Sequence, residues 1–252
     1  MLISITDLIS KSWANYQKNW RSFLPYMVGM FIPSILVYAV GYLGIVLENR
    51  YNLSIFTGIL SIVIMIVAGI FTFWLGIAFA VAIKSSLVNE PIEDWKIALK
   101  KSTRLIVPVA TTSLLGGIII FGGTLLLIVP GIIFGVWYCF AFYTAIFENK
   151  KNTGALQSSK QLVVGRWWSI LWRLITPAIL FSIISGIMVS VLTWSLNMIG
   201  SLNAFNLQIA ANIISNLANA VFAPLLIGAQ ILLYLNAKAT PVTAPVVVPE
   251  IK

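Results

Sequence analysis

The sequence contains no histidine, a single cysteine and few charged residues, which make up 9% of its 252 positions. The absence of histidine removes the commonest general base and the commonest neutral metal ligand. One cysteine, Cys139, cannot form an internal disulfide. Soluble domains carry about 25% charged residues, so the scarcity of charge excludes a soluble globular or disordered chain. The net charge of +9 therefore does not indicate nucleic-acid binding.

Hydrophobic residues are abundant instead: they form 60% of the chain, and the mean hydropathy is +0.98. A helix that crosses the roughly 30 Å hydrocarbon core needs about 20 mostly apolar residues. The long apolar runs lack the alternation of barrel strands. We therefore predict an all-α integral membrane protein with six transmembrane helices, the third and fourth linked by a tight turn at 122–124. The predicted spans are 22–47, 55–84, 105–122, 125–147, 170–196 and 207–235.

The positive charges gather on one side of the predicted spans. Fifteen of the 16 lysines and arginines lie on the side of the two termini, and Arg50 lies on the other. The positive-inside rule then predicts a multi-pass protein of the plasma membrane with both termini in the cytoplasm. The Pro-rich segment 239–252 is expected to be a disordered cytoplasmic tail. Aromatic residues expected at the cytoplasmic boundary are Trp20, Trp167, Trp168, Trp172 and Tyr234.

Three amphipathic segments precede the pairs of spans and share sequence fragments. Ala98-Leu99-x-x-Ser102 is similar to Ala155-Leu156-x-x-Ser159, and Ser12…Trp20 is similar to Ser159…Trp167. We predict that the segments are interfacial helices and that the membrane domain, 1–238, is a threefold repeat of one interfacial helix and two spans. Chance similarity among apolar helices is the alternative. The predicted units are 4–84, 89–147 and 152–236, related by an axis along the membrane normal.

Capping patterns predict where the interfacial helices begin. Ser4 with Asp7 forms a capping box for the first. Acidic Glu93 and Asp94 are expected in the first turn of the second helix, after Asn89 and Pro91. Either Asn152 or Thr153 is expected to cap the third.

Basic residues of the second and third interfacial segments form the first candidate site. One interpretation is that they attract anionic lipid headgroups. The other is a cytoplasmic platform that binds a partner protein or one particular headgroup. Lys84 and Arg173, at span ends, are expected to extend toward the interface. The candidate headgroup or partner surface comprises Lys96, Lys100, Lys101, Arg104, Lys150, Lys151, Lys160 and Arg166.

A stripe of amides in the sixth span is the second candidate site. Gln208, Asn212, Asn216 and Asn219 are spaced four, four and three residues apart and share one helix face. Gln230 continues this face beyond a kink expected at Pro224. Bare amides are costly against lipid, so the stripe should face protein or water. It predicts either hydrogen bonding to the fifth span, through Ser182, Gly186, Ser190 and Thr193, or a polar lining for a small-molecule or headgroup cavity.

Small residues also mark close helix packing. Gly131-x-x-x-Gly135 in the fourth span lets helix backbones approach. Packing within the chain and dimerisation are both consistent with it, so a homo-oligomer remains open. Cys139 continues this line as a small packing residue.

One stretch resembles a known family. Leu127-Ile128-Val129-Pro130-Gly131-Ile132, Trp137, Phe140, Glu148, and Gly165-Arg166-Trp167-Trp168 are similar to the membrane domain attached to some glycerophosphoryl diester phosphodiesterases and to related bacterial integral membrane proteins. Pro224-Leu225-Leu226 and Tyr234 fit its last span. The resemblance implies a six-span helical domain. It implies no catalysis, because the acids and histidines of the separate phosphodiesterase domain have no counterpart here.

These observations predict a protein without enzymatic activity, since no nucleophile–base pair, phosphate loop or metal-ligand cluster is present in the sequence. No cofactor, metal or nucleic acid is expected. The first functional hypothesis is a membrane scaffold or interaction domain with a basic cytoplasmic surface, which contacts anionic headgroups and a cytoplasmic protein partner. The second is a transporter or lipid-handling protein with a polar cavity beside the sixth span.

Overall fold

The computed structural model describes residues 2–51, 54–198 and 204–241. Within these ranges the chain is helical and has no β-strand, and six helical segments are long and apolar enough to cross a membrane. The all-α membrane architecture and its six spans are therefore confirmed. The helices are α1 (Ile5–Tyr51), α2 (Ser54–Leu87), α3 (Trp95–Ser102), the 3-10 turn η1 (Thr103–Leu105), α4 (Ile106–Leu126), α5 (Ile128–Trp137), α6 (Ala141–Phe147), α7 (Asn152–Val163), α8 (Trp167–Met198) and α9 (Ala204–Ala239).

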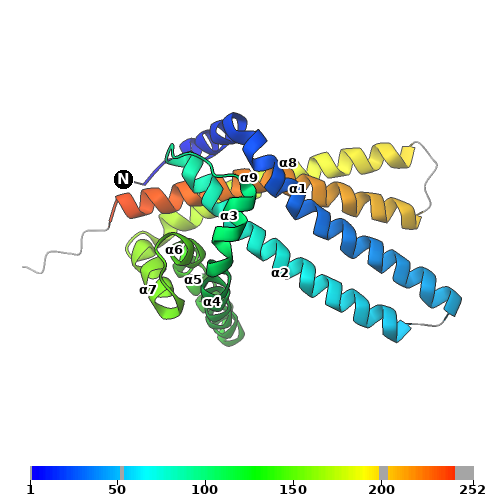
Figure 1. Cartoon of the computed structure of the whole chain (residues 1–252). Coiled ribbons are helices and arrows are strands. Elements are labelled where there is room, and N and C mark those ends of the chain that lie inside the picture. The colour runs from blue at the N-terminus through cyan, green and yellow to red at the C-terminus, as the bar shows by residue number, and fades with distance from the viewer. Residues whose placement is uncertain (1, 52–53, 199–203, 242–252) are drawn as a thin grey trace, which may run out of the picture.

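The helices form three hairpin arms that diverge from one end of the molecule (Figure 1). The arms are α1–α2, α4–α5 and α8–α9. At their common end, α3, α6 and α7 lie beside the N-terminal part of α1 and the C-terminal part of α9. We call this end the hub. The predicted interfacial segments all lie in the hub, and the helices of the arms extend away from it.

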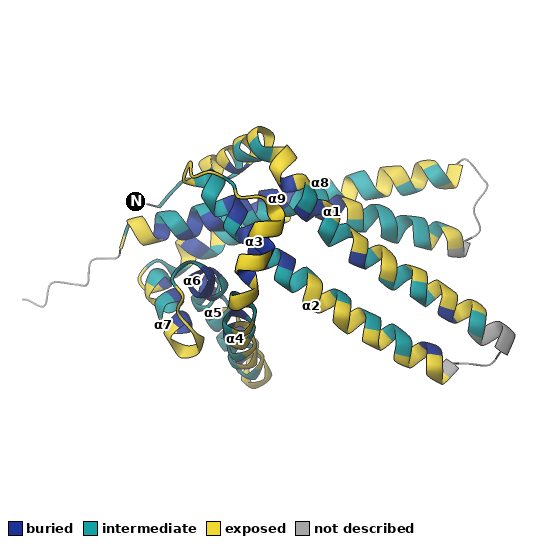
Figure 2. Ribbon diagram, in the orientation of Figure 1, coloured by how far each residue is buried: buried dark blue, intermediate teal, exposed yellow. Residues whose placement is uncertain are grey.

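Buried residues concentrate in the hub, while the outer parts of the arms are mostly exposed or intermediate (Figure 2). Tyr26 of α1 stacks on Phe79 of α2 at 5.0 Å, and Phe140 contacts the ring of Tyr234 in α9 at 5.8 Å. Along the arms, large apolar side chains stay outside, with Leu126 81% exposed. Such long apolar surfaces are expected where lipid, and not water, is the solvent.

The first interfacial helix begins as the sequence predicts, and the other two begin differently. The first is continuous with α1, and its Ser4 Oγ accepts a hydrogen bond from the Asp7 N–H at 3.0 Å, as the capping pattern predicted. The start of the second was predicted too early, because Asp94 is itself the cap and accepts from the Lys96 N–H at 2.9 Å. In the third, Lys151 occupies the cap position, and the Asn152 N–H donates to Thr112 Oγ1 at 2.8 Å.

The turn of the second arm is also displaced from its predicted place at 122–124. The helix α4 continues to Leu126, and Leu127 alone is extended, with φ −160°. Gly123 and Gly131 instead lie where α4 and α5 touch: a Cβ on Gly131 would lie 2.9 Å from the Thr124 Cα. These glycines are needed for close packing and not for the turn.

One further detail differs from expectation in the later spans. The fourth predicted span is interrupted between α5 and α6, where the Phe140 N–H donates to Ser159 Oγ of α7 at 3.1 Å. Pro224 lies inside α9, which runs from Ala204 to Ala239, and the kink expected there stays a prediction. Of the predicted tail, Ala239 ends α9, and residues 242–252 lie outside the described ranges.

Three serines that the sequence placed at equivalent positions are all buried. Ser12, Ser102 and Ser159 are at most 2% exposed. Ser12 Oγ donates to the Leu225 carbonyl of α9 at 2.6 Å, and Ser159 Oγ donates to the Trp137 carbonyl of α5 at 2.7 Å. Close to the third serine, Ser102, the Trp74 Nε1–H of α2 donates to the Leu99 carbonyl of α3 at 3.0 Å. Each interfacial helix thus packs on the second span of another predicted unit. The threefold repeat itself stays a prediction.

Candidate functional site

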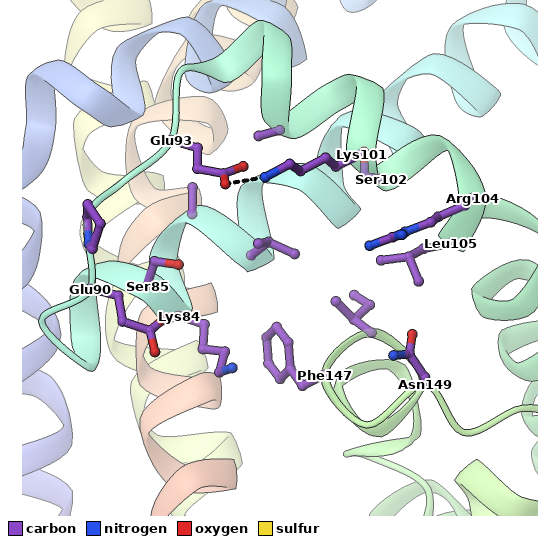
Figure 3. A pocket seen from close by; sticks show the side chains of 15 residues that line it. Lys84, Ser85, Glu90, Glu93, Lys101, Ser102, Arg104, Leu105, Phe147 and Asn149 are labelled. Carbon is purple, nitrogen blue, oxygen red and sulfur yellow. Dashed lines mark hydrogen bonds and ion pairs between the residues drawn. The ribbon is translucent and has the colours of Figure 1, made fainter.

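A pocket of about 450 Å³ lies in the hub between α2, α3 and the end of α6 (Figure 3). Lys84 lies in the last turn of α2, and Arg104 lies in the short turn before α4 begins. The pocket therefore sits where two spans end. Its lining residues are Val81, Ala82, Lys84, Ser85, Glu90, Pro91, Glu93, Ala98, Lys101, Ser102, Arg104, Leu105, Ile146, Phe147 and Asn149.

The charges in this pocket are only partly paired. Lys101 forms an ion pair with Glu93 on the same wall. Lys84 is half-buried, and its ammonium group lies 5.2 Å from the centre of the Phe147 ring. Arg104 is exposed. Among the described residues, neither Lys84 nor Arg104 forms an ion pair, so the pocket has two cations available to a ligand.

A polar network centred on Glu148 adjoins this pocket. Its carboxylate accepts a hydrogen bond from the Tyr234 hydroxyl at 2.7 Å and ion pairs from Lys238 at 2.9 Å and Lys150 at 3.0 Å. Burial on its own raises the pKa of Glu148, but the hydrogen bonds from Lys238, Tyr234 and Lys150 outweigh it and lower the pKa to about 2. The carboxylate thus joins the end of α6 to α9.

Tyr234, which was expected near the cytoplasmic boundary, is enclosed inside the hub. It is 1% exposed and packs on Phe140, Tyr143 and Phe147. A buried tyrosine hydroxyl needs a partner, which Glu148 provides. Periodicity along one helix cannot show this pairing, because the two residues lie 86 positions apart.

Two arginines also join hub segments by hydrogen bonds to backbone carbonyls. Arg166 donates to the Ala237 carbonyl at 2.6 Å and to Thr240 Oγ1 at 3.1 Å, at the C-terminal end of α9. Burial lowers the pKa of Arg166 from its ordinary value. Arg173 donates to the Ile3 carbonyl at 2.6 Å, and Asn236 accepts from the Ile3 N–H at 2.8 Å. Arg166 thus caps a helix, and Arg173 holds the N-terminal segment.

The other residues of the predicted basic surface lie at the hub in different settings. Lys96, Lys100 and Lys151 are exposed. Lys160 is half-buried, with its ammonium 4.1 Å from the centre of the Trp137 ring. Lys150 is occupied by Glu148 and by Ser158 Oγ at 2.7 Å. Among the described residues, Lys100 and Lys151 therefore form no ion pair or ring contact. Lys150 and Lys160 make intramolecular contacts, as does Lys96, whose ammonium lies 5.6 Å from the centre of the Trp95 ring.

The amide stripe of the sixth span divides between two neighbouring helices. Asn216 donates to the Tyr38 hydroxyl of α1 at 3.3 Å and to the Asn212 carbonyl at 2.8 Å. Gln230 accepts from the Tyr143 hydroxyl at 2.7 Å, in the hub. Gln208 is exposed near the far end of α9.

The remaining stripe residue, Asn219, lies in a groove of about 380 Å³ between α8 and α9. Its polar lining includes Ser182, Ser190 and Ser215, together with Gly186. The structure therefore brings the predicted hydroxyl face of the fifth span beside one amide of the stripe. A Cβ on Gly186 or Gly135 would meet nothing within 4 Å, whereas Gly131 lies against Thr124.

The comparisons with known proteins add no relative: no family model, no curated protein and no solved structure matches the chain. The resemblance to the membrane domain of glycerophosphoryl diester phosphodiesterases therefore stays a prediction. Among the described residues, no three side chains of histidine, cysteine, aspartate or glutamate come together as a metal site would require.

Proposed function

We propose that the chain is a non-catalytic membrane scaffold whose hub lies against the anionic headgroups of the cytoplasmic leaflet of the plasma membrane. The observation that carries this proposal is the group of exposed cations at the hub. Lys96, Lys100, Arg104 and Lys151 are exposed, and among the described residues none of them forms an ion pair. A lysine or arginine near an anionic surface contributes about 1 kcal/mol of attraction.

The exposed indole rings of the hub support the same placement. Trp20, Trp168 and Trp172 are 47%, 67% and 57% exposed. Indole rings favour the membrane–water boundary, because one edge is polar and the body is apolar. Aromatic rings and free cations at the same end of the arms are consistent with a hub at headgroup depth, on the side that the positive-inside rule assigns to the cytoplasm.

Lipid enrichment around the purified protein tests this function. The chain is reconstituted in nanodiscs that contain phosphatidylcholine and fluorescent phosphatidylglycerol, and energy transfer from the tryptophans reports the nearby anionic lipid. Changing Lys96, Lys100 and Lys151 to glutamine should lower the transfer, and the matched change to arginine should preserve it. Equal transfer for wild type and the glutamine variant would contradict the proposal.

A second function, transport or lipid handling, is favoured by the groove between α8 and α9. Its serines and Asn219 line an open space at the depth of the spans. In a Cys139→Ala background, we expect cysteine at Asn219 to react with a water-soluble thiol reagent and cysteine at Ile183, exposed on the same arm, to react slowly. Equal protection of both cysteines from the reagent would indicate that lipid, and not water, fills the groove, and would contradict the transport function.

A further inference from the structure

The pocket of Figure 3 differs from the rest of the basic surface because it is concave and holds two cations, Lys84 and Arg104, that form no ion pair among the described residues. We propose that it binds a phosphate group, either on a phospholipid headgroup or on a free small molecule, with Lys84 and Arg104 as the cationic ligands. This proposal rests on the proposed function only for the depth of the hub in the membrane. It goes further by assigning one site and one chemical group.

Lys84 provides the first argument. The residue is half-buried, and its ammonium lies 5.2 Å from the centre of the Phe147 ring. An aromatic face stabilises a cation by about 0.5–2 kcal/mol. A bound anion would give this ammonium a charged partner in a concave site, where water screens the attraction less than on an open surface.

The opposite wall provides the second argument. Arg104 and Asn149 extend toward the pocket from the side facing Lys84 (Figure 3). Guanidinium presents parallel N–H donors that match two phosphate oxygens, and an ammonium adds a point charge. The Ser85 hydroxyl and the Asn149 amide provide neutral donors in the same lining.

The acidic residues of the lining indicate which phosphate fits. Glu93 is neutralised by Lys101, so Glu90 is the acid of this lining that forms no ion pair among the described residues. Two available cations and one carboxylate favour a ligand with a single negative charge. A phosphodiester carries one charge, whereas a phosphomonoester carries nearly two at neutral pH. We therefore expect a phosphodiester headgroup to bind more tightly than phosphatidic acid.

Native mass spectrometry of the full chain in a phosphate-free detergent tests this site. The probes are phosphatidylglycerol, phosphatidic acid, diacylglycerol with the same acyl chains, and free glycerophosphoglycerol, which is the phosphodiester headgroup without acyl chains. Lys84→Gln with Arg104→Gln should weaken phosphatidylglycerol binding by roughly tenfold or more, the equivalent of about 1.4 kcal/mol. The matched control, Lys11→Gln with Arg21→Gln, makes the same charge change at exposed positions outside the pocket and should alter binding by less than about threefold.

The outcomes separate the alternatives. Lys84→Arg with Arg104→Lys should retain most of the binding, which excludes misfolding as the cause of a loss. Binding of free glycerophosphoglycerol with the same dependence on Lys84 and Arg104 would identify a small molecule as the source of the phosphate. Equal losses in the pocket and control variants, or equal binding of diacylglycerol, would overturn the site. The proposed function would still stand if the nanodisc measurement succeeded.

Discussion

Glu148→Gln is the substitution that most sharply tests how the hub is held together. It keeps the shape of the side chain and removes the charge that Tyr234, Lys238 and Lys150 share. A hydrogen bond to a charged group is worth about 1.5–3 kcal/mol and a neutral one about 0.5–1.5, so the Tyr234 bond should weaken by about 1 kcal/mol. The two lysines are roughly half exposed, and their pairs should contribute about 1 kcal/mol together.

The total loss of about 2 kcal/mol should be visible in thermal unfolding of the purified protein. At about 2–4 °C per kcal/mol for a chain of this size, the midpoint should fall by roughly 4–8 °C. Tyr234→Phe, combined with Glu148→Gln in a double-mutant cycle, should show a coupling of about 1 kcal/mol. Glu93→Gln is the control, because its pair with Lys101 is exposed and should contribute less than about 1 kcal/mol. Additive effects of the Glu148 and Tyr234 substitutions would refute the network.

Three further predictions follow from the same structure. The pKa of Glu148 is about 2, below its ordinary 4.5. The stabilisation from ionised Glu148 should therefore be complete above about pH 4.5 and should be lost as the pH falls toward 2. Over this pH range, the thermal midpoint of wild type should drop more than that of Glu148→Gln. Gly131→Ala should destabilise the α4–α5 arm by about 1–3 kcal/mol in thermal unfolding, because its Cβ would meet Thr124. Gly135→Ala should be neutral or stabilising, because its Cβ would meet nothing within 4 Å. Equal effects of the two substitutions would contradict the close approach of α4 and α5 at Gly131. Arg166→Lys keeps the charge but loses the paired N–H donors to the end of α9. Amide hydrogen exchange should therefore accelerate at the last turn of α9. Unchanged exchange at this turn would contradict the capping role of Arg166.

The number and order of the spans could be predicted from the sequence because they depend on local composition. A run such as 55–84 is apolar over most of its length, and no distant residue is needed to recognise it. The cap at Ser4 could be predicted for the same reason, since its hydrogen bond joins residues three positions apart.

Features that depend on distant partners were missed. The aromatic ring and polar tip of Tyr234 match a boundary residue, and only the position of Glu148 at the end of α6 explains its burial. Lys84 and Arg104 also come from different predicted units, so the sequence pattern of a single helix does not indicate the pocket between them. The turn at Leu127 was misplaced because glycines at a helix crossing have the same local signature as glycines in a turn.

Both proposals require the hub to lie at the cytoplasmic surface of the plasma membrane, and thiol labelling in intact cells tests this most directly. Single cysteines replace Lys100 and Lys151 in the hub, and Asn197 near the far end of α8, in a Cys139→Ala background. A membrane-impermeant reagent should label the cysteine at position 197 from outside, and should label those at 100 and 151 only after the membrane is opened. Labelling of the hub cysteines in sealed cells would contradict the account.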